Sequence, residues 1–156
     1  MSLSRTLLTS TLLTAAAGSA VVAVVVVAPA AGAADAGRPL FASLSGANEV
    51  PAGSGDPDGT GTAAVTVNSG TGMICFDLAL KNIGTPSMAH IHEAPAGKNG
   101  SVVVGFFGGQ VPATDSGCVT VDRTLAKEIR QSPADYYVNV HTAEYPGGAV
   151  RGQLSK

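Results

Sequence analysis

Short runs of alternating apolar and polar residues, separated by turns rich in glycine, proline, asparagine and aspartate, recur from residue 39 to residue 154. The alternation is clearest in residues 64–67, 74–80 and 138–140. A period of two residues is typical of a strand with one buried face. The pattern predicts eight strands, over residues 39–44, 61–67, 73–80, 88–92, 102–107, 118–121, 136–141 and 149–154.

One segment departs from this pattern and predicts a helix. Residues 122–131 are rich in helix-forming residues, with Leu125 and Ile129 four positions apart, and Pro133 follows. A single short helix crossing between strands fits these features. Eight strands without alternating helices favour an all-β fold, either an antiparallel β-sandwich or a Greek-key barrel. With four phenylalanines, three tyrosines and no tryptophan, the core must be packed mainly by valine, leucine, isoleucine and alanine.

The first 33 residues are typical of a signal peptide. Arg5 precedes an apolar stretch that reaches Val27, Pro29 interrupts it, and small residues occupy positions 31–33. We expect cleavage after Ala33. An uncleaved membrane anchor is the alternative, because the stretch approaches the roughly 20 residues that span a bilayer. The expected organisation is a signal peptide over 1–33, a short linker over 34–38 and one domain over 39–156.

The charge pattern excludes two classes of partner. Removal of Arg5 with the leader leaves eight basic residues against eleven acidic ones, without a cluster of lysine or arginine. Nucleic-acid binding and anionic-membrane binding therefore have no electrostatic basis. No second apolar span follows the leader, so we expect no membrane contact after cleavage. The expected location is extracytoplasmic, secreted or in the cell envelope, with an extracytoplasmic protein or an envelope component as partner.

The two cysteines, Cys75 and Cys118, are expected to form a disulfide, because exported domains usually pair an even number of cysteines. Each lies opposite the apolar residues of its predicted strand, so both side chains leave on the less apolar side. Closing a loop of about 44 residues is worth roughly 4 kcal/mol in the chain-entropy model. A two-cysteine metal site is the alternative, and the lack of a C-x-x-C motif disfavours it.

All three histidines lie in two of the predicted strands. His90 and His92 share the polar face of residues 88–92, and His141 lies on the polar face of residues 136–141. Same-face positions on a strand are about 6.6 Å apart, and imidazoles at that spacing can bind one ion at about 2 Å. The three residues predict a copper or zinc site, provided that the two strands are neighbours.

A binding or structural role is the first interpretation of the same polar face, and metal binding by the histidines is the alternative. Four further residues are predicted on or near it, where they would form a polar-face network with the histidines: Glu49, Asn139, Arg151 and Gln153. In that case the histidines hold strand ends together. The domain is then a non-catalytic binding or structural module, and its polar strand face is the interaction surface.

Three segments resemble the CHRD domain family, named for chordin. They are residues 44–51 (LSGANEVP), 89–100 (AHIHEAPAGKNG) and 137–154 (YVNVHTAEYPGGAVRGQL), in the order usual for that family. The family often has an acidic residue where this chain has Ala149. The resemblance implies a single-domain exported microbial member with an immunoglobulin-like or superoxide-dismutase-like β-sandwich. It implies no growth-factor binding, because chordin's cysteine-rich modules have no counterpart here.

An enzyme is the least favoured class. A dismutase would need more metal ligands than three histidines, and a hydrolase using His141 with Glu144 would need an activated nucleophile. No serine lies in a Gly-x-Ser-x-Gly context. We therefore expect a protein without catalytic residues.

Overall fold

The computed structural model describes residues 37–156, so the predicted signal peptide lies outside the described residues. The described chain forms one antiparallel sheet with the strand order β5-β4-β7-β8-β1-β2-β3-β6. The strands are β1 (Arg38–Ser45), β2 (Thr60–Asn68), β3 (Met73–Lys81), β4 (Pro86–Glu93), β5 (Ser101–Gly108), β6 (Thr114–Thr120), β7 (Tyr136–Thr142) and β8 (Val150–Gln153).

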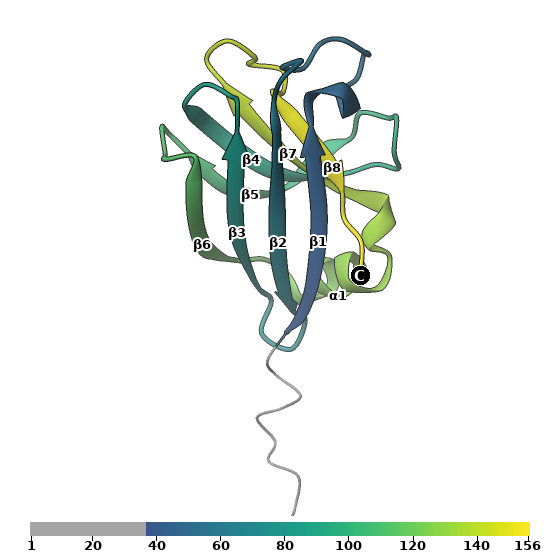
Figure 1. The fold of residues 1–156 in the computed structure, drawn as a ribbon. Helices are drawn as coiled ribbons and strands as arrows, with labels where there is room; N and C mark the ends of the chain where they lie inside the picture. Colours follow the sequence, from purple (N-terminus) through teal and green to yellow (C-terminus); the bar gives the residue numbers. More distant parts are fainter. Residues whose placement is uncertain (1–36) are drawn as a thin grey trace, which may run out of the picture.

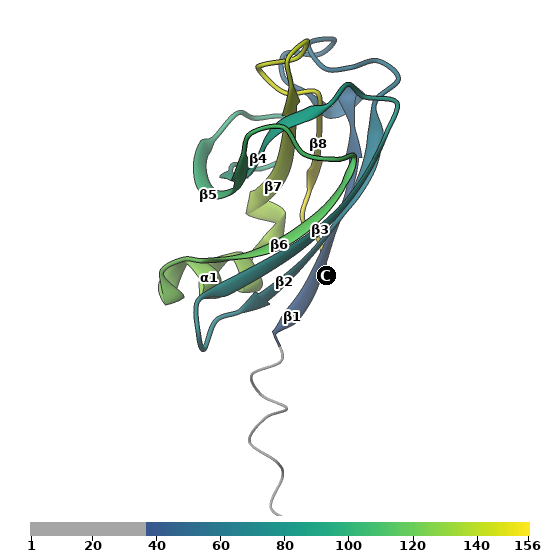
Figure 2. The ribbon, with the colours of Figure 1, turned by 90° about the vertical axis from the view of Figure 1, so that its left-hand side faces the viewer.

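The sheet curls into a nearly closed barrel. β1, β2, β3 and β6 form one wall, which faces the viewer in Figure 1. β4, β5, β7 and β8 form the other wall, and Figure 2 shows the two walls from the side. The end strands of the order, β5 and β6, contact each other. The predicted all-β antiparallel fold with one short helix is confirmed.

The core lies between the two walls, because each strand turns its apolar positions inward. On β3, Ile74, Phe76 and Leu78 are buried, whereas the residues between them lie on the outer face. The ring of Phe76 stacks on Phe106 of β5 with 4.3 Å between centroids, which joins the two walls. As the composition predicts, the largest fully buried side chains among the described residues are all leucine, isoleucine or valine, among them Leu40, Leu44, Ile74, Leu78, Ile91, Ile129, Leu154 and Val65.

The helix α1 (Arg123–Gln131) lies at the lower end of the barrel in both views (Figures 1 and 2). Its N-cap is Asp122, whose side chain accepts a hydrogen bond from the backbone N–H of Thr124 at 2.7 Å. α1 buries Ala126 and Ile129 and contacts β2. A 3-10 turn, η3 (Pro133–Asp135), leads from it into β7. Within residues 37–156 no helix has the length and apolarity to cross a membrane.

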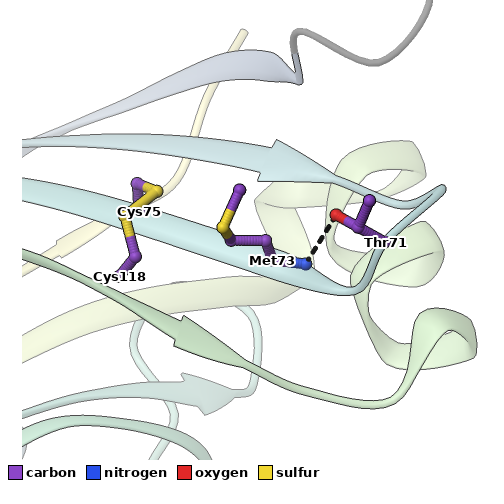
Figure 3. Close-up of a disulfide and its surroundings, with 4 residues drawn as sticks. All are labelled: Thr71, Met73, Cys75 and Cys118. Atoms are coloured by element: carbon purple, nitrogen blue, oxygen red, sulfur yellow. Dashed lines mark hydrogen bonds between the residues drawn. A yellow bond between two sulfur atoms is a disulfide. The ribbon is translucent and has the colours of Figure 1, made fainter.

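A disulfide joins Cys75 of β3 to Cys118 of β6 (Figure 3). The two residues are direct partners in the β3–β6 ladder, with Cα atoms 4.0 Å apart. Met73, whose side chain is exposed, lies on β3 near Cys75. The predicted disulfide is confirmed, so both cysteines of the chain are used in it.

Strand β7 differs from the others because every one of its residues is buried. Val138 and Val140 face the core. Tyr137, Asn139 and His141 point outward, where they are covered by three connecting segments, residues 46–59, 94–100 and 143–149. We call these three side chains and the segments over them the polar layer. The polar layer is the part of the fold that positions the candidate site.

Candidate metal site

The structure brings the three histidines together. His90 and His92 lie on the outer face of β4, alternating with the buried Ala89 and Ile91. β4 pairs with β7, so His141 lies on the neighbouring strand, opposite Met88. One ring nitrogen from each histidine can be chosen so that all three lie within 4.8 Å of one another. The condition set by the sequence, that the two histidine strands be neighbours, is met.

Backbone carbonyls orient two of the rings. Nδ1 of His92 lies 3.0 Å from the carbonyl oxygen of Gly100, and Nδ1 of His141 lies 3.0 Å from that of Pro146. A carbonyl oxygen only accepts, so Nδ1 is the donor in both rings and Nε2 carries the lone pair of the neutral imidazole. Metal-binding histidines are usually held in this way by a partner on the second nitrogen.

The two Nε2 atoms have different surroundings. Nε2 of His141 lies 3.2 Å from Nδ1 of His90. Because Nε2 of His141 carries the lone pair, it accepts the hydrogen bond and Nδ1–H of His90 donates it. Nε2 of His92 is buried and has no hydrogen-bond partner among residues 37–156. Leaving a buried acceptor without a partner costs roughly 1–3 kcal/mol. A ring nitrogen of His92 lies within 4.8 Å of a nitrogen of each of the other two rings, so an ion bound between the rings would satisfy this lone pair.

The environment keeps all three imidazoles neutral at neutral pH. Burial, with smaller contributions from the neighbouring rings of His141 and His92, lowers the pKa of His90 to about 4. Burial also lowers the pKa of His92 and of His141, against the opposing effect of their carbonyl partners. Metal ions bind the neutral imidazole, so these shifts lessen competition from protons.

Tyr137 supports His92 from the side. The two rings stack almost parallel, with 4.8 Å between centroids and 6° between planes. The hydroxyl of Tyr137 accepts a hydrogen bond from the backbone N–H of Gly100 at 3.3 Å. Tyr137 therefore holds both the ring of His92 and the residue whose carbonyl orients that ring.

Arg151 of β8 holds the segment that carries Gly100. Its guanidinium carbon lies 4.6 Å from the centroid of the Tyr137 ring. Its Nη1 donates to Oδ1 of Asn99 at 2.9 Å and to the carbonyl of Lys98 at 3.3 Å. Its Nε donates to the carbonyl of Asn48 at 2.6 Å, on the segment between β1 and β2. One side chain thus connects two of the covering segments.

Glu49 and Asn139 occupy the middle of the polar layer. Nδ2 of Asn139 donates to the carboxylate of Glu49 and, at 3.2 Å, to the carbonyl of Val150. Burial raises the pKa of Glu49 to about 7, although Arg151 and the bond from Asn139 act to lower it. The carboxylate also packs against Gly148, where a Cβ atom would lie 2.7 Å from both of its oxygens.

The predicted polar-face residues therefore bond mainly to the covering segments. Gln153, the fourth of them, donates from Nε2 to the carbonyls of Ala94 at 2.8 Å and Ala134 at 2.6 Å. The three histidine rings bond instead to backbone carbonyls and to each other. The face thus contains two adjoining parts, a histidine cluster and a layer of loop-holding side chains.

Comparison with known families agrees with this architecture. The model of the CHRD domain family matches residues 40–154. The chain belongs to the CHRD domain family. CHRD domains are a non-catalytic domain family, and every residue of the site described above lies within the matched range. No curated protein and no solved structure matches the chain.

Sequence reasoning did not single out several residues that shape the site of this CHRD domain. Tyr137 lies on the same face of β7 as Asn139 and His141, because alternate residues of a strand point to the same side. This spacing of two residues was the only feature of the sequence that indicated Tyr137. Gly100 and Pro146 act through their carbonyls, which no side-chain pattern reveals. Both lie inside the segments that resemble the CHRD family, as does Gly148.

Proposed function

We propose that this CHRD domain is an exported, non-catalytic module that binds a copper or zinc ion through His90, His92 and His141. The observation that carries the proposal is the buried Nε2 of His92, which has no partner among the described residues and lies close to the other two rings. Three nitrogens at about 2 Å from one ion lie roughly 3.3–3.5 Å apart. The three nitrogens now lie within 4.8 Å of one another, and small rotations of the rings would bring them to the spacing that an ion requires.

The chemistry of the ligands favours copper or zinc over other ions. Calcium and magnesium take oxygen ligands, whereas imidazole suits zinc, copper and similar transition metals. Nδ1 of His90 and Nε2 of His141 are 3.2 Å apart and share a proton that an ion would displace. The hydrogen bonds from His92 and His141 to backbone carbonyls supply the outer support that such sites use.

Export is supported by the Cys75–Cys118 disulfide and by the signal-like pattern of residues 1–33. An extracytoplasmic protein or an envelope component remains the proposed partner of the polar face. Glu49, Asn139 and Arg151 are only 5%, 3% and 4% exposed. Side chains this buried offer little surface to a macromolecule, so a protein or envelope partner would meet the histidine side of this face.

Metal binding is tested on the mature domain, purified with a tag that contains no histidine. The chain has three histidines and no free cysteine, so a bound soft ion has no competing site of these types. After loading and dialysis we expect about one equivalent of copper or zinc in the wild type, measured by plasma mass spectrometry. His92→Gln and His141→Gln should each retain less than a tenth of that amount.

Controls separate loss of the ion from loss of the fold. Glutamine can still donate to the backbone carbonyls, so both variants should melt like the metal-free wild type. Ser87→Ala, on the same strand as His90, removes a hydrogen bond to the His141 carbonyl and should bind metal normally. Equal, near-zero copper and zinc in the wild type and both glutamine variants would refute the proposal.

Export is tested separately, by the N-terminus of the protein recovered outside the cell. We expect it to begin at Ala34. Recovery only from the membrane fraction, with residues 1–33 retained, would contradict export of a free domain. Affinity capture with the recovered protein, compared between wild type and His90→Gln, tests whether the histidine side meets an envelope partner.

A further inference from the structure

Arg151 is a buried cation that makes no hydrogen bond to a carboxylate of the described residues. Its side chain is 4% exposed, and its hydrogen bonds go to the carbonyls of Asn48 and Lys98 and to the amide oxygen of Asn99, all uncharged. No ion pair links it to a carboxylate within residues 37–156. Glu49 acts on it electrostatically but is hydrogen-bonded to Asn139. A buried charge without a counter-charge is costly to a fold.

The guanidinium retains a free donor. Its hydrogen bonds use Nε and Nη1. Nη2 makes none of these hydrogen bonds and is not among the fully buried atoms that lack a partner, so it keeps some contact with solvent. A cationic N–H to an anionic oxygen forms the stronger, charge-assisted kind of hydrogen bond. An anion is therefore the kind of outside acceptor that this donor would bind most strongly.

A small hollow lies over this side chain. It has a volume of about 160 Å³ and is lined by Asn48, Ala96, Gly97, Arg151 and Gln153. A water molecule takes about 30 Å³ and a drug-sized ligand needs at least about 300 Å³. The hollow thus has room for a carboxylate on a short carbon stem and for nothing much larger.

The rim of the hollow is an exposed, basic turn. Residues 95–98 form it, closed by a hydrogen bond from the N–H of Lys98 to the carbonyl of Pro95 at 3.2 Å. Gly97 stands at the tip with φ +75°, and a Cβ there would meet nothing within 4 Å. Lys98 is exposed and gives this turn one positive charge. Access from solvent and a positive potential both favour a small anion.

We propose that this hollow binds the carboxylate of a small organic acid, held by Nη2 of Arg151. This site is separate from the histidine cluster, and it does not depend on whether an ion binds there. The few donors and the small buried surface predict a weak site. We expect millimolar affinity for a short acid such as acetate.

The test is an NMR titration of the metal-free mature domain with sodium acetate. Chelator is present throughout and sodium chloride keeps the ionic strength constant. We expect saturating shifts of the backbone amides of Ala96 and Gly97, the side-chain amide of Gln153 and Nε–H of Arg151. Shifts that grow linearly without saturation, or that sodium chloride reproduces, would overturn the proposal.

Two variants make the assignment specific. Arg151→Lys keeps the charge but loses the planar donor, and it should weaken acetate binding at least tenfold. Ala96→Glu places a tethered carboxylate at the exposed rim without touching Arg151, and it should abolish acetate binding by occupying the hollow. Lys98→Gln is the control and should weaken binding no more than about threefold. Acetate binding of wild-type strength in Ala96→Glu would refute the site even if Arg151→Lys fails to fold.

Discussion

Replacing Glu49 by glutamine removes a titrating group from the polar layer while keeping its packing. The glutamine carbonyl oxygen can still accept the hydrogen bond that Asn139 donates to the carboxylate. What disappears is the cost of holding a charge in a buried place. We therefore expect Glu49→Gln to stabilise the domain at pH 8 and to leave it nearly unchanged at pH 4.5.

The size of the effect follows from the pKa. The folded protein raises the pKa of Glu49 from 4.5 to about 7, so the unfolded chain loses this proton at lower pH than the folded one. The stability that the protonated carboxyl provides is complete below about pH 4.5 and is lost as the pH rises through 7. The full shift corresponds to about 3.4 kcal/mol. Solvent screening at the edge of the covering segment reduces this, and we expect roughly 2 kcal/mol.

The assay is urea unfolding, followed by circular dichroism at pH 4.5, 6, 7 and 8. The lowered pKa values of His90, His92 and His141 act in the opposite direction, because they make the wild type more stable as the pH rises toward 6.5. That contribution is present in both proteins. It therefore cancels in the difference between the variant and the wild type.

Glu144→Gln is the matched control, because Glu144 lies in a covering segment as Glu49 does but its side chain is exposed. It should change the free energy of unfolding by less than about 0.5 kcal/mol at every pH. A Glu49→Gln difference that stays constant across the series would refute the reasoning. A variant that loses stability as the pH rises would show that attraction to Arg151 outweighs burial.

Three further predictions concern backbone, cross-link and site. Gly148→Ala should destabilise the domain by more than about 2 kcal/mol, because the residue has φ +138° and its new Cβ would clash with a carboxylate. Gly147→Ala, whose new Cβ would have no atom within 4 Å, should change stability very little. Thermal melts of both variants measure the difference. Replacing Cys75 and Cys118 by serine should cost roughly 4 kcal/mol in urea unfolding, from the length of the loop they close; a cost below about 1 kcal/mol would contradict the loop argument. Tyr137→Phe should leave the metal-free melting temperature within a few degrees and weaken metal affinity several-fold in competition titrations, because the Gly100 N–H loses its acceptor. Unchanged affinity would show that ring stacking alone orients the histidine.

Alternation predicted most of the fold because apolar positions on a strand must share one face. β3 was predicted from Met73 to Leu80 and is observed over Met73–Lys81. β6 shows where this signal ends. It begins at Thr114, four residues before the predicted start, and none of its residues is buried. Residues 114–117 contain no large apolar side chain, so alternation could be recognised only near Val119, which packs against the core.

The site was predictable in part for a similar reason. The alternation of residues along each strand placed His90, His92 and His141 on polar faces. Alternation does not determine which strands are neighbours. The pairing of β4 with β7 is a property of the whole sheet order. The carbonyls of Gly100 and Pro146 reach the rings because the covering segments fold back over β7, and side-chain types do not encode that path.

Strand β6 also has a consequence for self-association. It is an end strand of the sheet, it buries none of its side chains, and the disulfide to Cys75 ties it to β3. If the thiols stay reduced, β6 can separate from β3 and leave one edge of β3 without a pairing strand, while the other edge stays paired with β2. An exposed, regular edge of that kind is a template for pairing with another molecule. Oxidation of Cys75 and Cys118 thus keeps β6 paired over the edge of β3. A domain made under reducing conditions should aggregate through β3 before the core unfolds.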